Sequence, residues 1–148
     1  MARTSPFHQR VSSNMPFELD DYFRGGGLAE VFPAPVDVIL TSHDVIQPDI
    51  VVVADPRQIS VRAIEGPPLL MVEVLSPESR AHDQTVKAPR CATLGVRHYW
   101  FVEPEAKAVE CHRLENAQYE MVARGEADST VSHPDWPDLA LDLRAVWP

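Results

Sequence analysis

The sequence predicts a mixed α/β (α+β) fold in which one β-sheet is flanked by helices, all within a single domain spanning residues 1–148. Short runs rich in branched and aromatic residues, separated by turn formers, indicate strands. Apolar residues at three- and four-residue spacing indicate helices before and between those strands. A chain of 148 residues without internal repeats suits one core, so these elements should pack around one sheet.

The first helix should begin at Thr4-Ser5-Pro6, where a hydroxyl N-cap precedes a proline at the first helical position. Pro16 lies inside the helix and should kink or restart it. Gly25-Gly26-Gly27 should end it. The apolar residues recur as one helical stripe, which consists of Phe7, Val11, Met15, Leu19 and Tyr22.

Strands should follow from residue 30 onward. The expected runs are EVF, VDVIL, DIVVVA, LLMVEVL and HYWFV, then a hairpin of AVECHRL and QYEMVAR. DIVVVA and LLMVEVL are almost wholly apolar, which is typical of strands buried on both faces. Residues 76–94 should form a loop and a helix that Pro89 bends and Gly95 ends. The tail, HPDWPDLALDLRAVW, should pack back as a short edge element.

The acidic composition limits the ways in which the protein can bind nucleic acid. A net charge of −9 argues against binding by overall electrostatics, since a phosphate backbone is neutralised by lysine and arginine. It does not exclude an enzyme that contacts phosphates locally through a metal ion. The carboxylates of such a site are themselves part of the negative charge.

The chain shows no signal for a membrane or for an oxidising compartment. No apolar run approaches the roughly 20 residues that span a bilayer, and the N-terminal residues lack the apolar core of a signal peptide. Cys91 and Cys111 show no CxxC spacing, so we expect two reduced structural thiols. The sequence therefore predicts a cytoplasmic protein without membrane contact.

Three charged residues stand where the patterns predict ordered or buried structure. Asp49 opens DIVVVA, Glu73 interrupts LLMVEVL, and Lys87 lies in the first turns of the next helix. Neighbouring strands that each carry one carboxylate can bring the pair close enough to share a hard cation such as Mg²⁺. A nearby lysine can orient a metal-bound water or stabilise developing phosphorane charge.

Each of these residues also has a structural explanation that the sequence leaves open. Asp49 follows a proline and can cap a turn. Glu73 can pair with an arginine, because a buried charge without a partner costs roughly several kcal/mol. Lys87 follows Asp83 by four residues, which is the spacing of a solvated helical ion pair. The arginines at positions 80, 90 and 97 form either a small basic rim or an ordinary solvated surface.

The sequence resembles the Uma2 family (DUF820) in GPPLLMVEVLSPESRAHDQTVK, VIQPDIVVV and LGVRHYWFVEPEAKAVECHRL, over roughly residues 28–148. The family resembles the PD-(D/E)xK nucleases, so the resemblance implies a restriction-endonuclease-like mixed sheet flanked by helices. It implies metal carboxylates at Asp49 of QPD and Glu73 of VEV. The usual ExK lysine would fall at Leu75, and Lys87 in the following helix matches the position to which this family has moved it.

The resemblance implies a metal-dependent endonuclease or phosphodiesterase. Asp49 and Glu73 would hold Mg²⁺ or Mn²⁺ with a backbone carbonyl near Val74, and Lys87 would position the attacking water. The expected substrate is nucleic acid, with DNA favoured, and a homodimer is a further expectation. His8-Gln9 matches a recurring family pair.

The alternative is a catalytically inactive nuclease-fold module for binding or dimerisation; a hydrolase of small phosphate esters is a third hypothesis. Relative to the family, the chain should lack the usual N-terminal hairpin, and Pro89 stands close enough to Lys87 to displace its amine.

Overall fold

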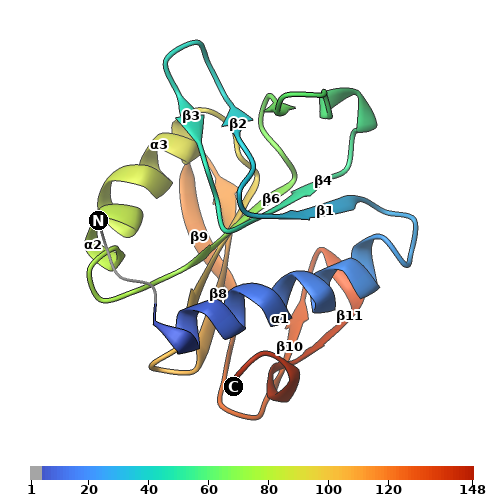
Figure 1. Cartoon of the computed structure of the whole chain (residues 1–148), viewed down its shortest axis with the longest axis vertical. Coiled ribbons are helices and arrows are strands. Elements are labelled where there is room, and N and C mark those ends of the chain that lie inside the picture. Colours follow the sequence, from blue (N-terminus) through green and yellow to red (C-terminus); the bar gives the residue numbers. More distant parts are fainter. Residues whose placement is uncertain (1–4) are drawn as a thin grey trace.

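The computed structural model describes residues 5–148 and consists of a six-stranded sheet with helices on both faces (Figure 1). The sheet order is β1-β4-β6-β7-β8-β9, and only β6 and β7 pair in parallel among these six strands. The predicted mixed sheet is therefore confirmed. Its strands are β1 (Glu30–Pro33), β4 (Ile50–Val53), β6 (Leu70–Val74), β7 (His98–Glu103), β8 (Ala108–Glu115) and β9 (Gln118–Glu126).

Helix α1 (Pro6–Phe23) lies across one face of the sheet (Figure 1). Ser5 caps it by accepting a hydrogen bond from the His8 N–H, as predicted, while Thr4 lies outside the described residues. The predicted restart at Pro16 does not occur, and Phe7 lies outside the buried stripe. A proline removes one helical hydrogen bond, and burial of the stripe on both sides of it holds the helix together. The buried stripe consists of Val11, Met15, Leu19 and Phe23.

The opposite face carries a second helical segment with an unusual middle. Helix α2 (Arg80–His82) passes into a π-helical turn (Asp83–Lys87) and then into α3 (Ala88–Thr93). The Ala88 N–H bonds to the Asp83 carbonyl across the wide turn. Pro89 has no N–H to donate, so the bend expected there takes the form of a π turn directly before it. Gly95, with φ +88°, follows the segment, in agreement with the prediction.

The sheet separates two apolar clusters because side chains alternate along each strand. Val72 and Val74 of β6 join the cluster beneath α1, whereas Met71 and Leu75 join the cluster beneath α3. Both β4 and β6 are buried at every residue, which confirms the prediction for DIVVVA and LLMVEVL. Both faces of the sheet are thus occupied, and the polar site lies at its end.

The C-terminal tail does not extend the main sheet, contrary to the prediction. It forms a separate two-stranded sheet of β10 (Thr130–His133) and β11 (Trp136–Asp142), followed by a short 3₁₀ turn. Ala127, with φ +54°, turns the chain after β9. Leu139 and Leu141 then join the cluster beneath α1. Packing across the face buries these side chains more fully than an edge position would.

The remaining elements agree with the sequence patterns. The β8–β9 hairpin turns at Asn116 and Ala117, both with positive φ, as a two-residue hairpin loop requires. A small sheet is formed by β2 (Val38–Ile39), β3 (Val45–Ile46) and β5 (Ile64–Glu65). Cys91 and Cys111 are buried free thiols. In the described part of the chain, no helix has the length and apolar character needed to cross a membrane.

Two buried histidines join the tail to the main sheet. His98 of β7 and His133 of β10 have ring centroids 5.4 Å apart, and His98 Nε2 lies 3.3 Å from an Asp135 carboxylate oxygen. Burial lowers the pKa of His98 to about 4, against the opposing effect of Asp135. Burial also lowers the pKa of His133. Both rings are therefore held neutral in the folded protein.

These histidines should make the fold sensitive to acid. The unfolded chain binds a proton at His98 near pH 6.5 and the folded chain only near pH 4, so stability falls as the pH is lowered through this window. We expect His98 to account for on the order of 2–3 kcal/mol of this loss. Urea unfolding at pH 7.5, 6 and 5 should show it, and His98→Gln should flatten the profile. The exposed His43→Gln is the matched control; equal profiles for both variants would contradict the assignment.

Candidate active site

Asp49 and Glu73 meet where β4 and β6 lie side by side. Ile50 pairs with Val72 in an antiparallel register, so Asp49, directly before β4, falls level with Glu73. Asp49 Oδ2 accepts a hydrogen bond of 2.7 Å from the Val74 N–H. The carboxylate of Asp49 therefore holds the end of β6 rather than capping a local turn, and it brings a charge next to Glu73.

Glu73 is the buried charge of the strand, with a side chain only 6% exposed. Alternation along β6 turns it toward the face covered by α3. Its partner is Lys87 rather than an arginine: Lys87 Nζ lies 2.7 Å from Glu73 Oε1. Oε1 has no further partner among the described residues. The two side chains form a close ion pair inside the fold.

Lys87 reaches Glu73 from the last residue of the π-helical turn. Its side chain is 19% exposed, and Pro89, which follows two residues later, does not keep the amine away from Glu73. Leu75, at the position of the usual ExK lysine, is buried in the apolar cluster beneath α3. A lysine there would bury its charge among apolar side chains, whereas the helical segment delivers the amine from outside the sheet.

The carboxylates of Asp49, Glu73 and Asp83 lie near one another, and Glu73 is shielded from solvent. Burial raises the pKa of Glu73, Lys87 opposes this shift, and the neighbouring Asp49 and Asp83 carboxylates add to it. Burial also raises the pKa of Asp83. For Lys87, burial acts to lower the pKa, but the surrounding carboxylates outweigh it and the pKa is raised. The lysine is thus charged, and its positive charge is shared among the neighbouring carboxylates.

His8 completes the site from α1. Its Nε2 lies 2.8 Å from the Val74 carbonyl oxygen; since a carbonyl only accepts, this nitrogen donates. The N–H of the same residue donates to Asp49, so the Val74 backbone is held through both its N–H and its carbonyl. Ser12 Oγ lies 3.4 Å from the other ring nitrogen of His8. Sequence reasoning noted His8 only through the family resemblance, because a contact across 66 residues leaves no local pattern.

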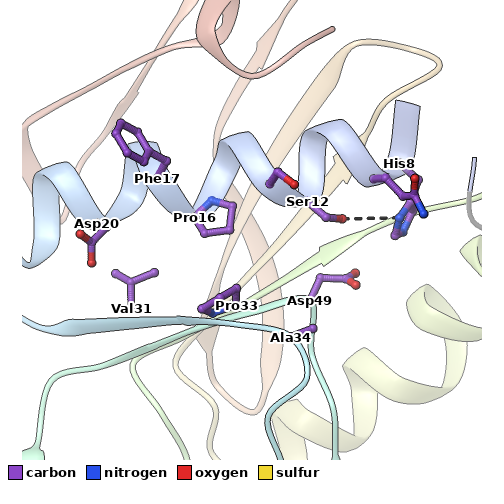
Figure 2. A pocket seen from close by; sticks show the side chains of 11 residues that line it. His8, Ser12, Pro16, Phe17, Asp20, Val31, Pro33, Ala34 and Asp49 are labelled. Carbon is purple, nitrogen blue, oxygen red and sulfur yellow. Dashed lines mark hydrogen bonds between the residues drawn. The ribbon is translucent and has the colours of Figure 1, made fainter. Parts of the chain in front are cut away.

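Two residues of the site, Asp49 and His8, line a groove between α1 and the edge strand β1. Figure 2 shows the helix along one side, β1 along the other, and Asp49 and His8 at one end. Its volume is about 820 Å³. Asp49 lines the groove, while Glu73 does not.

The donor set suits a hard cation. Carboxylate oxygens, such as those of Asp49 and Glu73, are the ligands that Mg²⁺ and Mn²⁺ accept. Within residues 5–148, no three His, Cys, Asp or Glu side chains are grouped so as to hold a metal ion by themselves. Water, a backbone carbonyl or substrate phosphate would have to complete the coordination, which is usual for Mg²⁺.

The mixed sheet and its flanking helices define a nuclease-like fold. Residues 1–144 match the family model of Uma2, described as "putative restriction endonuclease", and the chain belongs to this family. The crystal structure of "a putative nuclease belonging to DUF820" from Anabaena variabilis superposes with a TM-score of 0.71 at 20% identity, covering 94% of this chain and 79% of that one. Among curated proteins, none matches the chain. The predicted family and fold class are confirmed.

Loss of the Lys87 amine should destabilise the protein by about 1–3 kcal/mol. Lys87→Met leaves the Glu73 carboxylate buried without its counter-charge. Because burial raises the pKa of Glu73, the carboxylate can take up a proton, and the loss of unfolding free energy is smaller than for a group that must stay charged. We expect Glu73→Leu/Lys87→Met to be less destabilised than the sum of the single variants. Urea unfolding measures all three.

Lys107→Met, which changes the chain's other and exposed lysine, is the control for this cycle and should be nearly neutral. Additive effects of the Glu73 and Lys87 changes would show that the two side chains do not interact.

Proposed function

We propose that this protein is a metal-dependent nuclease that hydrolyses phosphodiester bonds in nucleic acid, with DNA as the favoured substrate. The observation that carries the proposal is the convergence of Asp49, Glu73 and Lys87. They come from two strands and a helical segment, and Lys87 Nζ approaches Glu73 Oε1 to 2.7 Å. Membership of the Uma2 family and the nuclease-like fold support the same function.

Each residue has a role that follows from its chemistry. Asp49 and Glu73 would hold Mg²⁺ or Mn²⁺, and the bound ion supplies Lewis acidity toward a phosphate oxygen and a water molecule of lowered pKa. Lys87 donates hydrogen bonds and carries positive charge, so it can orient the attacking water and stabilise negative charge on the phosphate. The Val74 peptide keeps the two carboxylate-bearing strands in register through its bond to Asp49.

The alternative is an inactive module that keeps the fold for binding or dimerisation. The lack of a third ligand side chain among the described residues favours it. The burial of Glu73 opposes this alternative. A carboxylate buried in an apolar strand lowers stability, and an inactive module would have no need to keep it. The two functions differ in one measurable respect, which is metal-dependent turnover.

The nuclease should cut plasmid or oligonucleotide DNA in Mn²⁺ or Mg²⁺ and lose activity when the site is altered. Asp49→Asn and Glu73→Gln keep the side-chain shape but weaken metal binding, and we expect rates to fall about 100-fold or more. Lys87→Met should lower the rate while Mn²⁺ binding persists. Gel assays give the rates, and calorimetry gives the Mn²⁺ affinity.

Asp55→Asn serves as the matched carboxylate control, because Asp55 pairs with Arg57 on the surface outside the site. The enzyme hypothesis fails if wild type binds no metal at millimolar concentration and cleaves no better than Asp49→Asn. That result would leave the inactive module.

His8 should act as a positioning residue for this site. His8→Ala removes the donor to the Val74 carbonyl, and we expect Mn²⁺ affinity or turnover to fall about 10- to 100-fold, the usual effect of losing a supporting contact. His8→Gln, which can still donate from its amide, should recover part of the loss. Arg10→Ala, on the same helix and exposed, should change neither quantity. Equal behaviour of the alanine and glutamine variants would contradict the role.

A further inference from the structure

The hydroxyl of Tyr99 is a buried polar group that the proposed mechanism does not use. Tyr99 of β7 is 0% exposed, and within residues 5–148 its hydroxyl oxygen has no hydrogen-bond partner. A hydroxyl that leaves water without gaining a partner lowers the stability of the fold. The neighbouring Tyr119 shows the usual arrangement, since its hydroxyl donates to the Val96 carbonyl at 2.7 Å. Tyr99 thus carries a hydrogen-bond donor where phenylalanine would avoid this cost.

This hydroxyl lies near the Glu73 carboxylate. Tyr99 pairs with Met71 in the parallel register of β6 and β7, and Glu73 follows Met71 by two residues, so the three side chains share one face of the sheet. On that face Met71 and Tyr99 belong to the cluster beneath α3. Burial raises the pKa of Tyr99, and Glu73 is the neighbouring group that adds most to this shift, ahead of Cys91 and Asp83. A buried donor and a buried carboxylate are therefore neighbours.

Glu73 depends on one amine that has a second task in the proposed reaction. Lys87 Nζ lies 2.7 Å from Glu73 Oε1, and among the described residues Lys87 is the only cation paired with this carboxylate. In the proposed nuclease the same amine orients the attacking water and stabilises charge on the phosphate. When the amine turns to that task, Glu73 loses hydrogen bonding and charge compensation inside the fold. A second donor beside Glu73 would offset this loss, and the Tyr99 hydroxyl is such a donor.

We propose that Tyr99 is a positioning residue of the site, whose hydroxyl donates a hydrogen bond to the Glu73 carboxylate when Lys87 turns away from it. The inference rests on the proposed nuclease function and adds to it a residue that holds a metal ligand in place. Tyr99 is buried and does not touch the substrate, so it acts through Glu73 alone. Lys87 is thereby free to contact water or phosphate while the carboxylate stays oriented.

Urea unfolding in EDTA tests the contact without metal or substrate. Tyr99→Phe removes only the hydroxyl; because that group has no partner in the wild type, the unfolding midpoint should stay unchanged or rise. In Lys87→Met the hydroxyl becomes the donor to Glu73, so adding Tyr99→Phe should lower the midpoint. Tyr119→Phe is the matched control and should lower the midpoint equally in both backgrounds, since it always removes the bond to Val96. An equal effect of Tyr99→Phe in both backgrounds would overturn the inference.

Calorimetry with Mn²⁺ and cleavage assays test the role in the site. Tyr99→Phe should weaken Mn²⁺ binding about tenfold, as expected when a group that orients a metal ligand is lost, and should lower kcat more than it changes KM. Tyr119→Phe should leave Mn²⁺ affinity unchanged. Reduced stability of Tyr99→Phe with wild-type Mn²⁺ affinity would show a merely structural hydroxyl and overturn the inference. If wild type neither binds Mn²⁺ nor cleaves DNA, the nuclease function fails, while the urea midpoints still decide whether Tyr99 serves Glu73.

Discussion

The burial of one carboxylate, Glu73, constrains the rest of the structure. A charge inside an apolar strand is tolerated only when a counter-charge reaches it, and no residue adjacent on β6 can supply one. Lys87 must therefore come from the segment that covers this face of the sheet, and it does so from the end of a π-helical turn. The π turn and Pro89 are connected. Because proline has no N–H to donate, an α-helical carbonyl would lose its donor here, and the hydrogen-bond pattern of the helix changes at this point.

The backbone of Val74, the residue after Glu73, links this part of β6 to β4 and α1. Its N–H fixes Asp49 of the neighbouring strand, and its carbonyl accepts from His8 on α1. Three elements far apart in the chain thus meet at the residue that follows Glu73. The same contacts that stabilise the strand end also bring the polar groups of the site together, which explains why a break in any of them should affect stability and chemistry at once.

The sequence predicted what depends on local pattern. The capped helix, the apolar strands β4 and β6 and the Asn116-Ala117 hairpin follow from spacing and turn residues, and the quoted motifs identified the family. It could not determine contacts between distant residues. Whether Glu73 paired with an arginine or with Lys87 depended on how the helical segment packs. The tail was misplaced because its alternating pattern suits a sheet edge and a separate hairpin equally well.

The acidic character of the chain limits how it can bind a phosphate backbone. With a net charge of −9 and two arginines of the α2–α3 segment already paired, the protein has little free positive charge to spread along a phosphate backbone. For the proposed nuclease, binding energy would come from a few places, namely a cation held by Asp49 and Glu73 and the Lys87 amine. Such an arrangement would make affinity less dependent on salt than in a basic nucleic-acid-binding protein, since few counterions would be released from the backbone.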